Sequence, residues 1–436
     1  MPTSSESRSL SPAGLEIRPF RALTYRRRDP GHLAQVSSPA YDLVTPSGRD
    51  RLASADPYNI VRLILPRCAV DGREHGEGEA AVHAADMLAS WQADGVLDRD
   101  PVSALWVYEL QPPDGAPATV GWLGAVGLPP AGSAAVLPHE DTYPGAVENR
   151  RALLAATATD LEPIVLAHDP DPTVAELTET ARRGDPTLEL SDSDGVGHRL
   201  WRVTEPAVLS RITEALARTG AVIADGHHRF AAARANSRAE PRVEGSDAVL
   251  ALVTPMGAGG LRVAPIHRVV PDLALDDALT AAGLGFRTAE LPVGSGGPAA
   301  VVAAVQRWLA TGDESGFLVT DGTRLYQLTE PSEAVLASVP PEAPPAWRRL
   351  DVVLAHHGLL SGLWHRGDDP ESVGIAHTVD DAVGTAVDRG GMALLLRAPS
   401  PADVAAVARA GARMPRKSTL FVPKPRTGLV LRPLAD

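Results

Sequence analysis

One ten-residue stretch limits what this chain can fold into more than any other. It is Ala221–Phe230, which reads Ala-Val-Ile-Ala-Asp-Gly-His-His-Arg-Phe. Its first half is apolar and contains β-branched residues, which favour a strand. Gly226 permits a backbone conformation that other residues resist, and the alanine-rich continuation predicts a helix. A strand, a turn and a helix in this order direct backbone N–H groups and the positive helix end to one place, where an anion such as phosphate can bind.

The side chains of this turn suit the same chemistry. Asp225 can hold a metal ion or accept a proton, and His227 and His228 can bind phosphate or move protons. Arg229 can contact two phosphate oxygens at once. The alternative is an ordinary Asp-Gly turn followed by an exposed basic helix start. Two histidines and an arginine beside the turn favour a functional site.

Length and charge exclude several classes of protein. At 436 residues the chain is longer than a chain that folds around one hydrophobic core usually is, so we expect two or three domains. The formal net charge of −13 argues against a nucleic-acid or membrane-surface protein, since both need a broad cationic face. The single cysteine, Cys68, excludes an internal disulfide and fits a cytoplasmic location.

Strand-like and helical patterns alternate without an internal repeat, which predicts a mixed α/β or α+β fold. The runs 17–25, 38–44 and 59–65 read as strands, and 104–110 and 121–128 read as a hairpin. Glycine- and proline-rich stretches indicate linkers. The expected organisation is a disordered tail over 1–14, an α/β core over 15–285, a small subdomain or insertion over 286–345, and a C-terminal α/β segment over 346–436 whose basic tail docks on the core.

The C-terminal region concentrates cations in an acidic chain. Arg416, Lys417, Lys424 and Arg426 flank the hydroxyls of Ser418 and Thr419. Such a cluster indicates a phosphate or carboxylate pocket, although a solvated basic tail has the same composition. The apolar residues 420–422 and two prolines favour a docked segment.

A second polar cluster is Pro138–Thr142, directly after a predicted strand. His139, Glu140 and Thr142 offer an imidazole, a carboxylate and a hydroxyl, which suit a general base or Mg²⁺. Helix capping explains the same residues equally well, and both interpretations stay open. The pair His356-His357 cannot chelate one metal from adjacent helix positions, so we interpret it as structural. Weaker candidates for the same site are Tyr41, Asp42, Arg151 and Arg268.

Several of these motifs together resemble a known family. They are Arg18–Ala22, Ser38–Asp42, Asp56–Asn59, His139-Glu140 with Thr142, Ala224–Arg229, and Met414–Thr419 continuing to Gly428. From about residue 15 to 433 the chain resembles the bacterial family of domain of unknown function 1015 (DUF1015). The Asp225–Arg229 turn also resembles the phosphate-binding loop of the ParB/sulfiredoxin superfamily, which includes sulfiredoxins, CTP-binding ParB proteins and kinases that phosphorylate free serine with ADP or ATP. This second resemblance implies a ParB/sulfiredoxin-like core.

The members of that superfamily can be separated by chemistry. The turn lacks the cysteine of sulfiredoxins, and the acidic chain lacks the basic helix pair of a DNA-partitioning protein. The resemblance then implies a kinase that transfers a phosphoryl group from ATP or ADP to a hydroxyl metabolite such as L-serine. A nucleotide-binding regulatory switch, a phosphatase and an ATP-dependent ligase are the alternatives. The implied partners are a nucleotide, Mg²⁺ and a small substrate, and a homodimer stays open.

This hypothesis distributes the candidate residues over four roles. The catalytic candidates are Glu140, Asp225 and His227. The nucleotide or phosphate contacts are Gly226, His228, Arg229, Arg268, Lys417, Ser418, Thr419 and Lys424. The substrate contacts are Tyr41, Asp42, His139, Thr142 and Arg151, and the magnesium ligands are Asp225 and Glu140.

Overall fold

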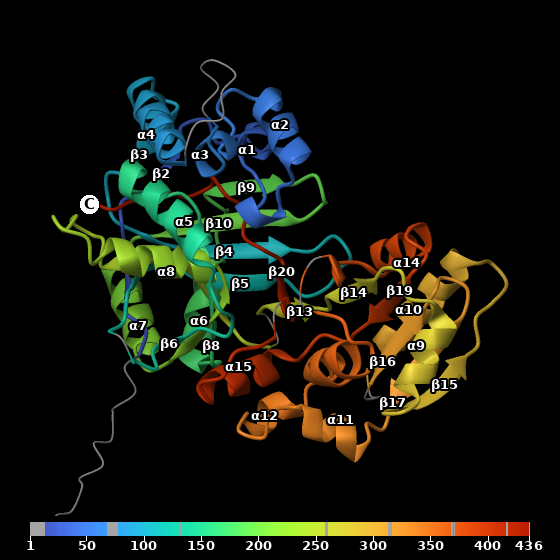
Figure 1. The fold of residues 1–436 in the computed structure, drawn as a ribbon. Helices are drawn as coiled ribbons and strands as arrows, with labels where there is room; N and C mark the ends of the chain where they lie inside the picture. The colour runs from blue at the N-terminus through green and yellow to red at the C-terminus, as the bar shows by residue number, and fades with distance from the viewer. Residues whose placement is uncertain are drawn as a thin grey trace, which may run out of the picture. The chain divides into compact units, whose positions relative to one another are not determined.

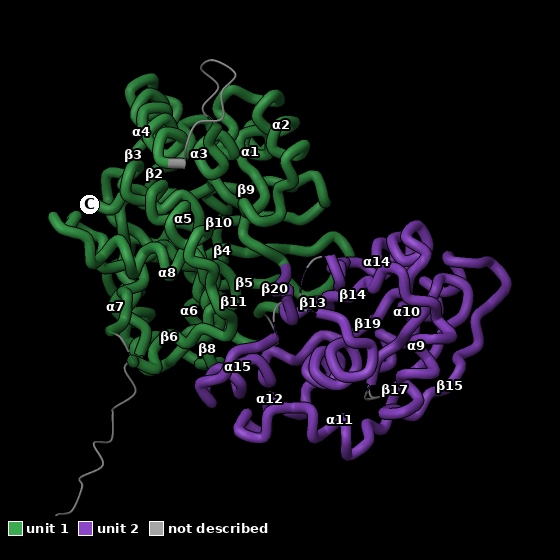
Figure 2. Tube along the Cα trace, in the orientation of Figure 1, with its two compact units in different colours: residues 1–261, 423–436 green, residues 262–422 purple. Residues whose placement is uncertain are grey.

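The computed structural model describes residues 14–67, 77–130, 132–257, 260–312, 316–367, 369, 371–415 and 417–435. The expectations for Cys68, Arg416 and the first 13 residues lie outside this part. The chain divides into two compact units, coloured green and purple in Figure 2. Unit 1 is residues 1–261 and 423–436, and unit 2 is residues 262–422. The predicted boundaries at 285 and 345 both fall within unit 2.

In the described part of unit 1, nine strands form one mixed sheet (Figure 1). Its main path runs through β6 (Val136–Leu137), β11 (Ala221–Asp225), β8 (Ile164–His168), β12 (Ala248–Pro255), β5 (Thr119–Gly127), β4 (Leu105–Gln111), β10 (Gly197–Val203) and β9 (Leu188–Ser191). β1 (Ile17–Arg18) pairs with β5 off this path. β11 is parallel to β6 and β8 is parallel to β12, whereas the remaining pairs are antiparallel. The β4–β5 pair is the predicted hairpin.

Helices cover both faces of this sheet. On β4, Trp106 and Tyr108 belong to one core cluster and Leu105 and Val107 to the other, because successive strand residues point to opposite faces. The first cluster includes residues of α1 (Pro30–Val36), α3 (Val61–Ile64), α4 (Glu77–Ala93) and α5 (Pro144–Thr157). The second includes residues of α6 (Pro172–Ala181), α7 (Pro206–Leu216) and α8 (His227–Asn236). The predicted mixed α/β fold is confirmed.

Two of the predicted N-terminal strands are wrong. Residues 38–44 contain the short 3₁₀ helix η1 (Tyr41–Leu43), which precedes α2 (Pro46–Ala55). Residues 59–65 contain α3 instead of a strand. The side-chain carbonyl of Asn59 accepts a hydrogen bond from the backbone N–H of Val61 at 2.9 Å, so a local side-chain contact starts the helix.

The end of the chain returns to unit 1 as an irregular segment, here called the strap, Pro423–Ala435. Its residue Thr427 exchanges two backbone hydrogen bonds with Ser38, at 2.9 and 3.1 Å. Leu431 does the same with Leu23, at 3.0 Å each way. Two short ladders complete the unit: β21 (Arg432–Pro433) with β7 (Thr159–Asp160), and β2 (Leu23–Tyr25) with β3 (Leu97–Arg99).

Unit 2 has its own antiparallel sheet and core. Six of its described strands lie in the order β15 (Arg287–Leu291), β17 (Leu325–Thr329), β16 (Phe317–Thr320), β19 (Met392–Leu395), β14 (His267–Val270) and β18 (Gly374–Ala376). The helices α10 (Pro298–Thr311) and α14 (Val379–Asp388) pack on one face through a cluster that includes Trp308 and Val383. A separate two-stranded ladder joins β13 (Arg262–Ala264) to β20 (Leu420–Val422).

The remaining helices of unit 2 are α9 (Leu275–Ala282), α11 (Glu333–Ser338), α12 (Pro345–Arg348), α13 (Asp351–Val353), the π-helical segment η2 (Leu354–Leu363) and α15 (Pro401–Arg409). Within the described residues of the whole chain, no helix is both long and apolar enough to cross a bilayer.

Candidate functional site

The site is built around the turn between β11 and α8. Gly226 stands between the strand and the helix with φ +92°, a conformation that favours glycine. A Cβ atom added there would lie 2.7 Å from Cγ2 of Ile164, so the position also needs glycine for space. The predicted strand, turn and helix are therefore present, and α8 begins directly after β11, the strand that lies between β6 and β8 in the sheet.

Asp225, the last residue of β11, binds two cations. Its Oδ1 atom lies 2.6 Å from Nζ of Lys424, and its Oδ2 atom lies 2.5 Å from Nη2 of Arg229. Lys424 comes from the strap and also lies 2.6 Å from Oδ2 of Asp42. The structure thus brings together residues from three distant segments of the chain.

Tyr41 lies between two arginines. The guanidinium carbon of Arg150 is 4.6 Å from the centre of the Tyr41 ring, and that of Arg229 is 5.7 Å from it. Below them the buried Glu162 accepts hydrogen bonds from the backbone N–H of Tyr41 at 3.0 Å and from the Thr427 hydroxyl at 3.1 Å. These contacts fix the N-terminal loop and the strap against the same carboxylate.

In this group of residues, burial and the neighbouring charges shift the pKa values in opposite directions. Burial alone would raise the pKa of Asp225, but Lys424 and Arg229 outweigh it and hold that pKa below its ordinary value. Burial likewise would lower the pKa of Lys424, but Asp225 and Asp42 keep it above its ordinary value. Glu162 behaves differently, because burial raises its pKa despite Arg229 and Arg150. Asp225 and Lys424 are thus a charged pair at neutral pH.

The two histidines of the turn hold a neighbouring loop. Nε2 of His227 accepts a hydrogen bond from the backbone N–H of His139 at 3.3 Å, and Nε2 of His228 accepts one from that of Tyr143 at 3.2 Å. The rings of Tyr143 and His228 are nearly parallel, with centres 5.9 Å apart. An imidazole that accepts at Nε2 is neutral and carries its proton on Nδ1. The histidines therefore position the loop that carries Glu140 beside the start of α8.

This loop does not cap the helix that follows it. α5 has Tyr143 at its N-cap position, without a side-chain hydrogen bond to the helix. Capping therefore does not explain Glu140 and Thr142, both of which are partly exposed in the loop. Their predicted roles as a base and a substrate contact stay predictions.

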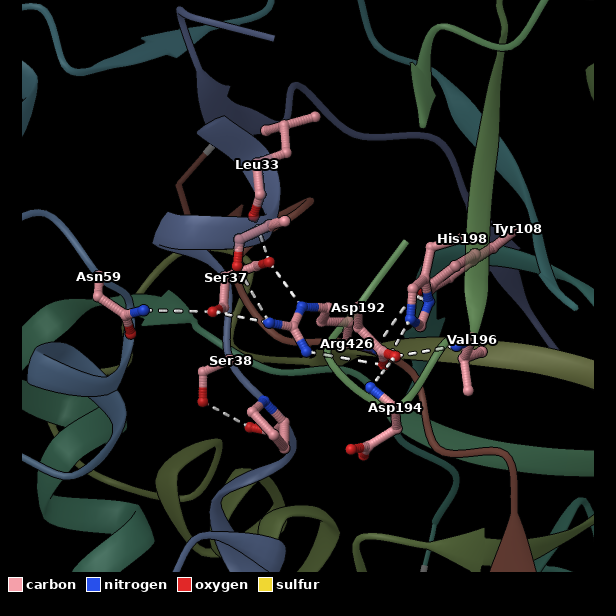
Figure 3. A network of polar contacts seen from close by, with 12 residues as sticks. Leu33, Ser37, Ser38, Asn59, Tyr108, Asp192, Asp194, Val196, His198 and Arg426 are labelled. Atoms are coloured by element: carbon pink, nitrogen blue, oxygen red, sulfur yellow. Dashed lines mark hydrogen bonds and ion pairs between the residues drawn. The ribbon is translucent and has the colours of Figure 1, made fainter. Parts of the chain in front are cut away.

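The strap that delivers Lys424 is held by a buried network (Figure 3). Nε of Arg426 donates to the Ser37 hydroxyl at 2.7 Å, and Nη1 lies 3.7 Å from Oδ2 of Asp192. Asp192 also lies 3.1 Å from Nε2 of His198, whose Nδ1 is 2.8 Å from the hydroxyl of Tyr108. That hydroxyl accepts a hydrogen bond from the backbone N–H of Arg426 at 3.0 Å. The network leaves the strap, and with it Lys424, little freedom to move.

Four predicted phosphate contacts belong to unit 2 and form their own cluster there. Arg268 is buried and donates to the carbonyl of Lys417 at 3.0 Å and to His356 at 3.1 Å. The hydroxyl of Ser418 donates to the carbonyl of Pro415 at 2.5 Å. Thr419 follows in the same segment. None of the contacts given above for the site in unit 1 involves these four residues. Their predicted role in binding phosphate stays a prediction.

Of the adjacent Arg150 and Arg151, Arg151 is the predicted substrate contact, and that role stays a prediction. Arg151 forms an ion pair with Glu148 on the exposed surface of α5. Arg150 contacts Tyr41 instead, and it lies three residues before the buried Leu153, which places both on the same helix face. Glu162 was also missed, because one acidic residue before a proline carries no pattern that reveals burial.

Metal binding at Asp225 gains no support from this geometry. Mg²⁺ binds carboxylate oxygens and water, but both oxygens of Asp225 contact side-chain cations. Among the described residues, no three His, Cys, Asp or Glu side chains lie together as a ligand set. The donor set seen here does not fit a magnesium ion on Asp225.

Comparisons with known proteins place the chain in a family. The family whose description reads "Protein of unknown function (DUF1015)" matches residues 17–353. No protein of curated function matches the chain.

Three solved structures share a distant likeness. A free serine kinase variant in complex with ADP has a TM-score of 0.33 and 11% identity, over 66% of this chain and 84% of its own. A C-terminally truncated SbnI from Staphylococcus aureus has a TM-score of 0.34 and 13% identity, over 71% and 87%. A conserved hypothetical protein from Pyrococcus furiosus has a TM-score of 0.31 and 12% identity, over 66% and 87%. At these TM-scores the likenesses carry no argument about activity.

Proposed function

This chain belongs to the DUF1015 family, and we propose that it is a small-molecule kinase that transfers a phosphoryl group from ATP or ADP to a hydroxyl metabolite, with free L-serine as the first candidate. The observation that carries the proposal is the convergence of Lys424 and Arg229 on Asp225 at the N-terminal end of α8. Two cations and a helix N-terminus at one point suit a polyphosphate. Phosphoryl transfer needs mainly such positioning and charge neutralisation.

In this proposal Asp225 positions the two cations. A nucleotide phosphate competes with Asp42 for Lys424, since the Asp42 side chain is the more exposed of the two partners of Lys424, at 36% against 12% for Asp225. Arg229 stays ordered by Asp225 and by the carbonyl of Pro163. A magnesium ion bound to the nucleotide phosphates would supply charge neutralisation, and Asp225 would keep both of its cations.

Glu140 is the proposed base. The loop that carries it is held to the first turn of α8 through the backbone of His139 and Tyr143. A carboxylate near the phosphate-binding turn can take the proton from the acceptor hydroxyl as the phosphoryl group arrives. Its neighbour Asp141 is exposed and serves as the matched control.

The test is product formation. The purified protein is incubated with Mg²⁺, ATP or ADP, and a pool of hydroxyl metabolites that includes L-serine, and mass spectrometry looks for a species heavier by one phosphoryl group. We expect Glu140→Gln to lower product formation by about 10²–10⁴-fold, the usual contribution of a general base, and Asp141→Asn to leave it within a few fold. Nucleotide binding without any product would replace the kinase by a regulatory switch, and phosphate release without nucleotide would indicate a phosphatase.

A further inference from the structure

A pocket lies in unit 1 among helices α2, α4 and α5 and the segment that follows α3. Its volume is about 290 Å³, near the lower limit of roughly 300 Å³ for small-molecule sites. Of its lining residues that the structure describes, three are arginines, Arg49, Arg67 and Arg150, and none is acidic. A pocket of this size and charge suits a small anion.

Two of the arginines are held in place by the backbone at the end of α3. Nε of Arg49 donates to the carbonyl of Leu65 at 3.1 Å, and Nη1 of Arg150 donates to that of Ile64 at 2.8 Å. A guanidinium has five N–H donors in a fixed plane, so these bonds orient each group while its remaining donors can serve a ligand. The conformational freedom that these two side chains lose when a ligand binds is therefore small.

Among the residues that the structure describes, the positive charge of these arginines is only partly compensated. Asp50 lies 2.5 Å from Nη1 of Arg67 and 3.4 Å from Nη1 of Arg49, so one carboxylate serves two arginines, and its side chain is 54% exposed. Burial, and after it the nearby Arg67, lowers the pKa of Arg49 despite Asp50.

Apart from the arginines, Thr45 and Asn149, the described residues that line the pocket are apolar. Leu65, Leu153 and Ala81 line the pocket together with Pro46. Burying aliphatic or aromatic carbon against these side chains is favourable, at about 25 cal/mol per Å². The complementary ligand has an anionic head and an apolar body of a few carbons.

We propose that this pocket binds a small organic anion, with its carboxylate or phosphate group on Arg49, Arg67 and Arg150 and its apolar part against Leu65 and Leu153. The site is distinct from the Asp225 turn, although Arg150 reaches both. It does not depend on the proposed kinase reaction.

Isothermal titration of the full-length protein tests the proposal, with phenyl phosphate, benzoate and inorganic phosphate as probes. We expect phenyl phosphate to bind about tenfold more tightly than inorganic phosphate, because only the former buries carbon. Arg67→Gln should weaken phenyl phosphate binding about 10–100-fold, the usual effect of losing a charged hydrogen-bond donor. Arg51→Gln is the control: it removes an exposed arginine of α2, the helix of Arg49, that does not line the pocket, and binding should stay within twofold.

A second variant separates the two sites. Lys424→Gln alters the Asp225 site and leaves the arginine-lined pocket intact. If Lys424→Gln weakens phenyl phosphate binding and Arg67→Gln does not, the anion binds at the turn and the proposal is overturned. Absence of binding by all three probes at 10 mM overturns it as well. The Arg67 side chain is about half exposed, so the variant should keep its thermal unfolding midpoint, which shows that lost binding does not come from lost folding.

Discussion

At the scale of single residues, Asp225 holds the candidate site together because each of its oxygens neutralises a different buried cation. We predict that Asp225→Asn lowers the free energy of unfolding by about 3–5 kcal/mol, the range for removing one partner of a buried ion pair. Urea denaturation followed by circular dichroism measures this change. Asp141→Asn alters an exposed carboxylate of the nearby loop and should cost under 0.5 kcal/mol. Equal stability of the Asp225→Asn protein and the wild type would show that the pair contributes nothing.

The same pair predicts a pH dependence of stability. The pKa of Asp225 is lowered by its cations, so its contribution is complete above the unfolded value of about 3.9 and is lost as pH falls through the lower folded pKa. The pKa of Lys424 is raised, so its contribution is complete below about 10.4 and is lost as pH rises through the higher folded pKa. The stability difference between wild type and Asp225→Asn should therefore be constant from pH 5 to 9 and shrink below about pH 4. A difference that already falls between pH 7 and 5 would contradict these directions.

Gly226 gives a third prediction at this scale. Gly226→Ala forces a Cβ atom to within 2.7 Å of Ile164 at a positive φ, so we expect a loss of about 2–3 kcal/mol from strain and overpacking. Gly145→Ala is the control, since it lies in the first turn of α5 with no atom within 4 Å of the added carbon. That substitution should leave the thermal midpoint unchanged or slightly higher, because alanine favours a helix. If both variants melt alike, the turn tolerates a side chain.

At the scale of elements, strands and helices with a clear hydrophobic pattern were predicted better than short segments whose structure depends on one side-chain contact. The β4–β5 hairpin and α4 follow directly from their hydrophobic spacing. The run 59–65 has the β-branched composition of a strand, but Asn59 bonds to the backbone of Val61 and the segment becomes helical. The composition of a short apolar run does not reveal such a contact, which is why that prediction failed.

In the candidate site, too, the local features could be predicted from the sequence and the long-range contact could not. Asp225–Arg229 was identifiable because its turn chemistry is local, and Lys424 because its charge stands out in an acidic chain. The contact between Lys424 and Asp225 spans 199 positions and depends on the strap, whose path is set by buried partners such as Arg426 and Ser37. Local patterns carry no information about which distant carboxylate a lysine meets.

The strap itself can be tested through the ion pair that it makes with β7. Nη1 of Arg432 lies 2.7 Å from Oδ2 of the buried Asp160, and it also donates to the carbonyl of Ala248 at 3.1 Å. We predict that Arg432→Met lowers the free energy of unfolding by about 3–5 kcal/mol, because Asp160 stays buried without its cation. Adding Asp160→Asn should recover part of this loss, so the double variant should cost less than the sum of the single ones. Arg183→Met, an exposed control, should change stability by under 0.5 kcal/mol.

At the scale of the whole molecule, the chain order suggests that unit 2 is an insertion into unit 1. Unit 1 consists of two stretches of chain, and unit 2 is the continuous stretch between them. Arg262 and Val422, the first and last residues of unit 2, are directly paired in the antiparallel β13–β20 ladder. Paired residues of this kind have Cα atoms about 4.5–5.5 Å apart, so the chain enters and leaves unit 2 at nearly the same point.

This arrangement predicts that unit 1 folds without unit 2. Replacing residues 262–422 by about four glycine and serine residues spans the short gap and keeps the strap, so we expect a monomeric protein with one cooperative unfolding transition. A second protein that ends at residue 261 lacks Lys424, Arg426 and Arg432, and it should be unstable because Asp225, Asp192 and the buried Asp160 each lose one cationic partner. Thermal unfolding and size-exclusion chromatography of the two proteins distinguish the roles of the strap and of unit 2. If the linker protein is as unstable as the truncated one, unit 1 depends on unit 2 for its fold, and the insertion hypothesis is wrong.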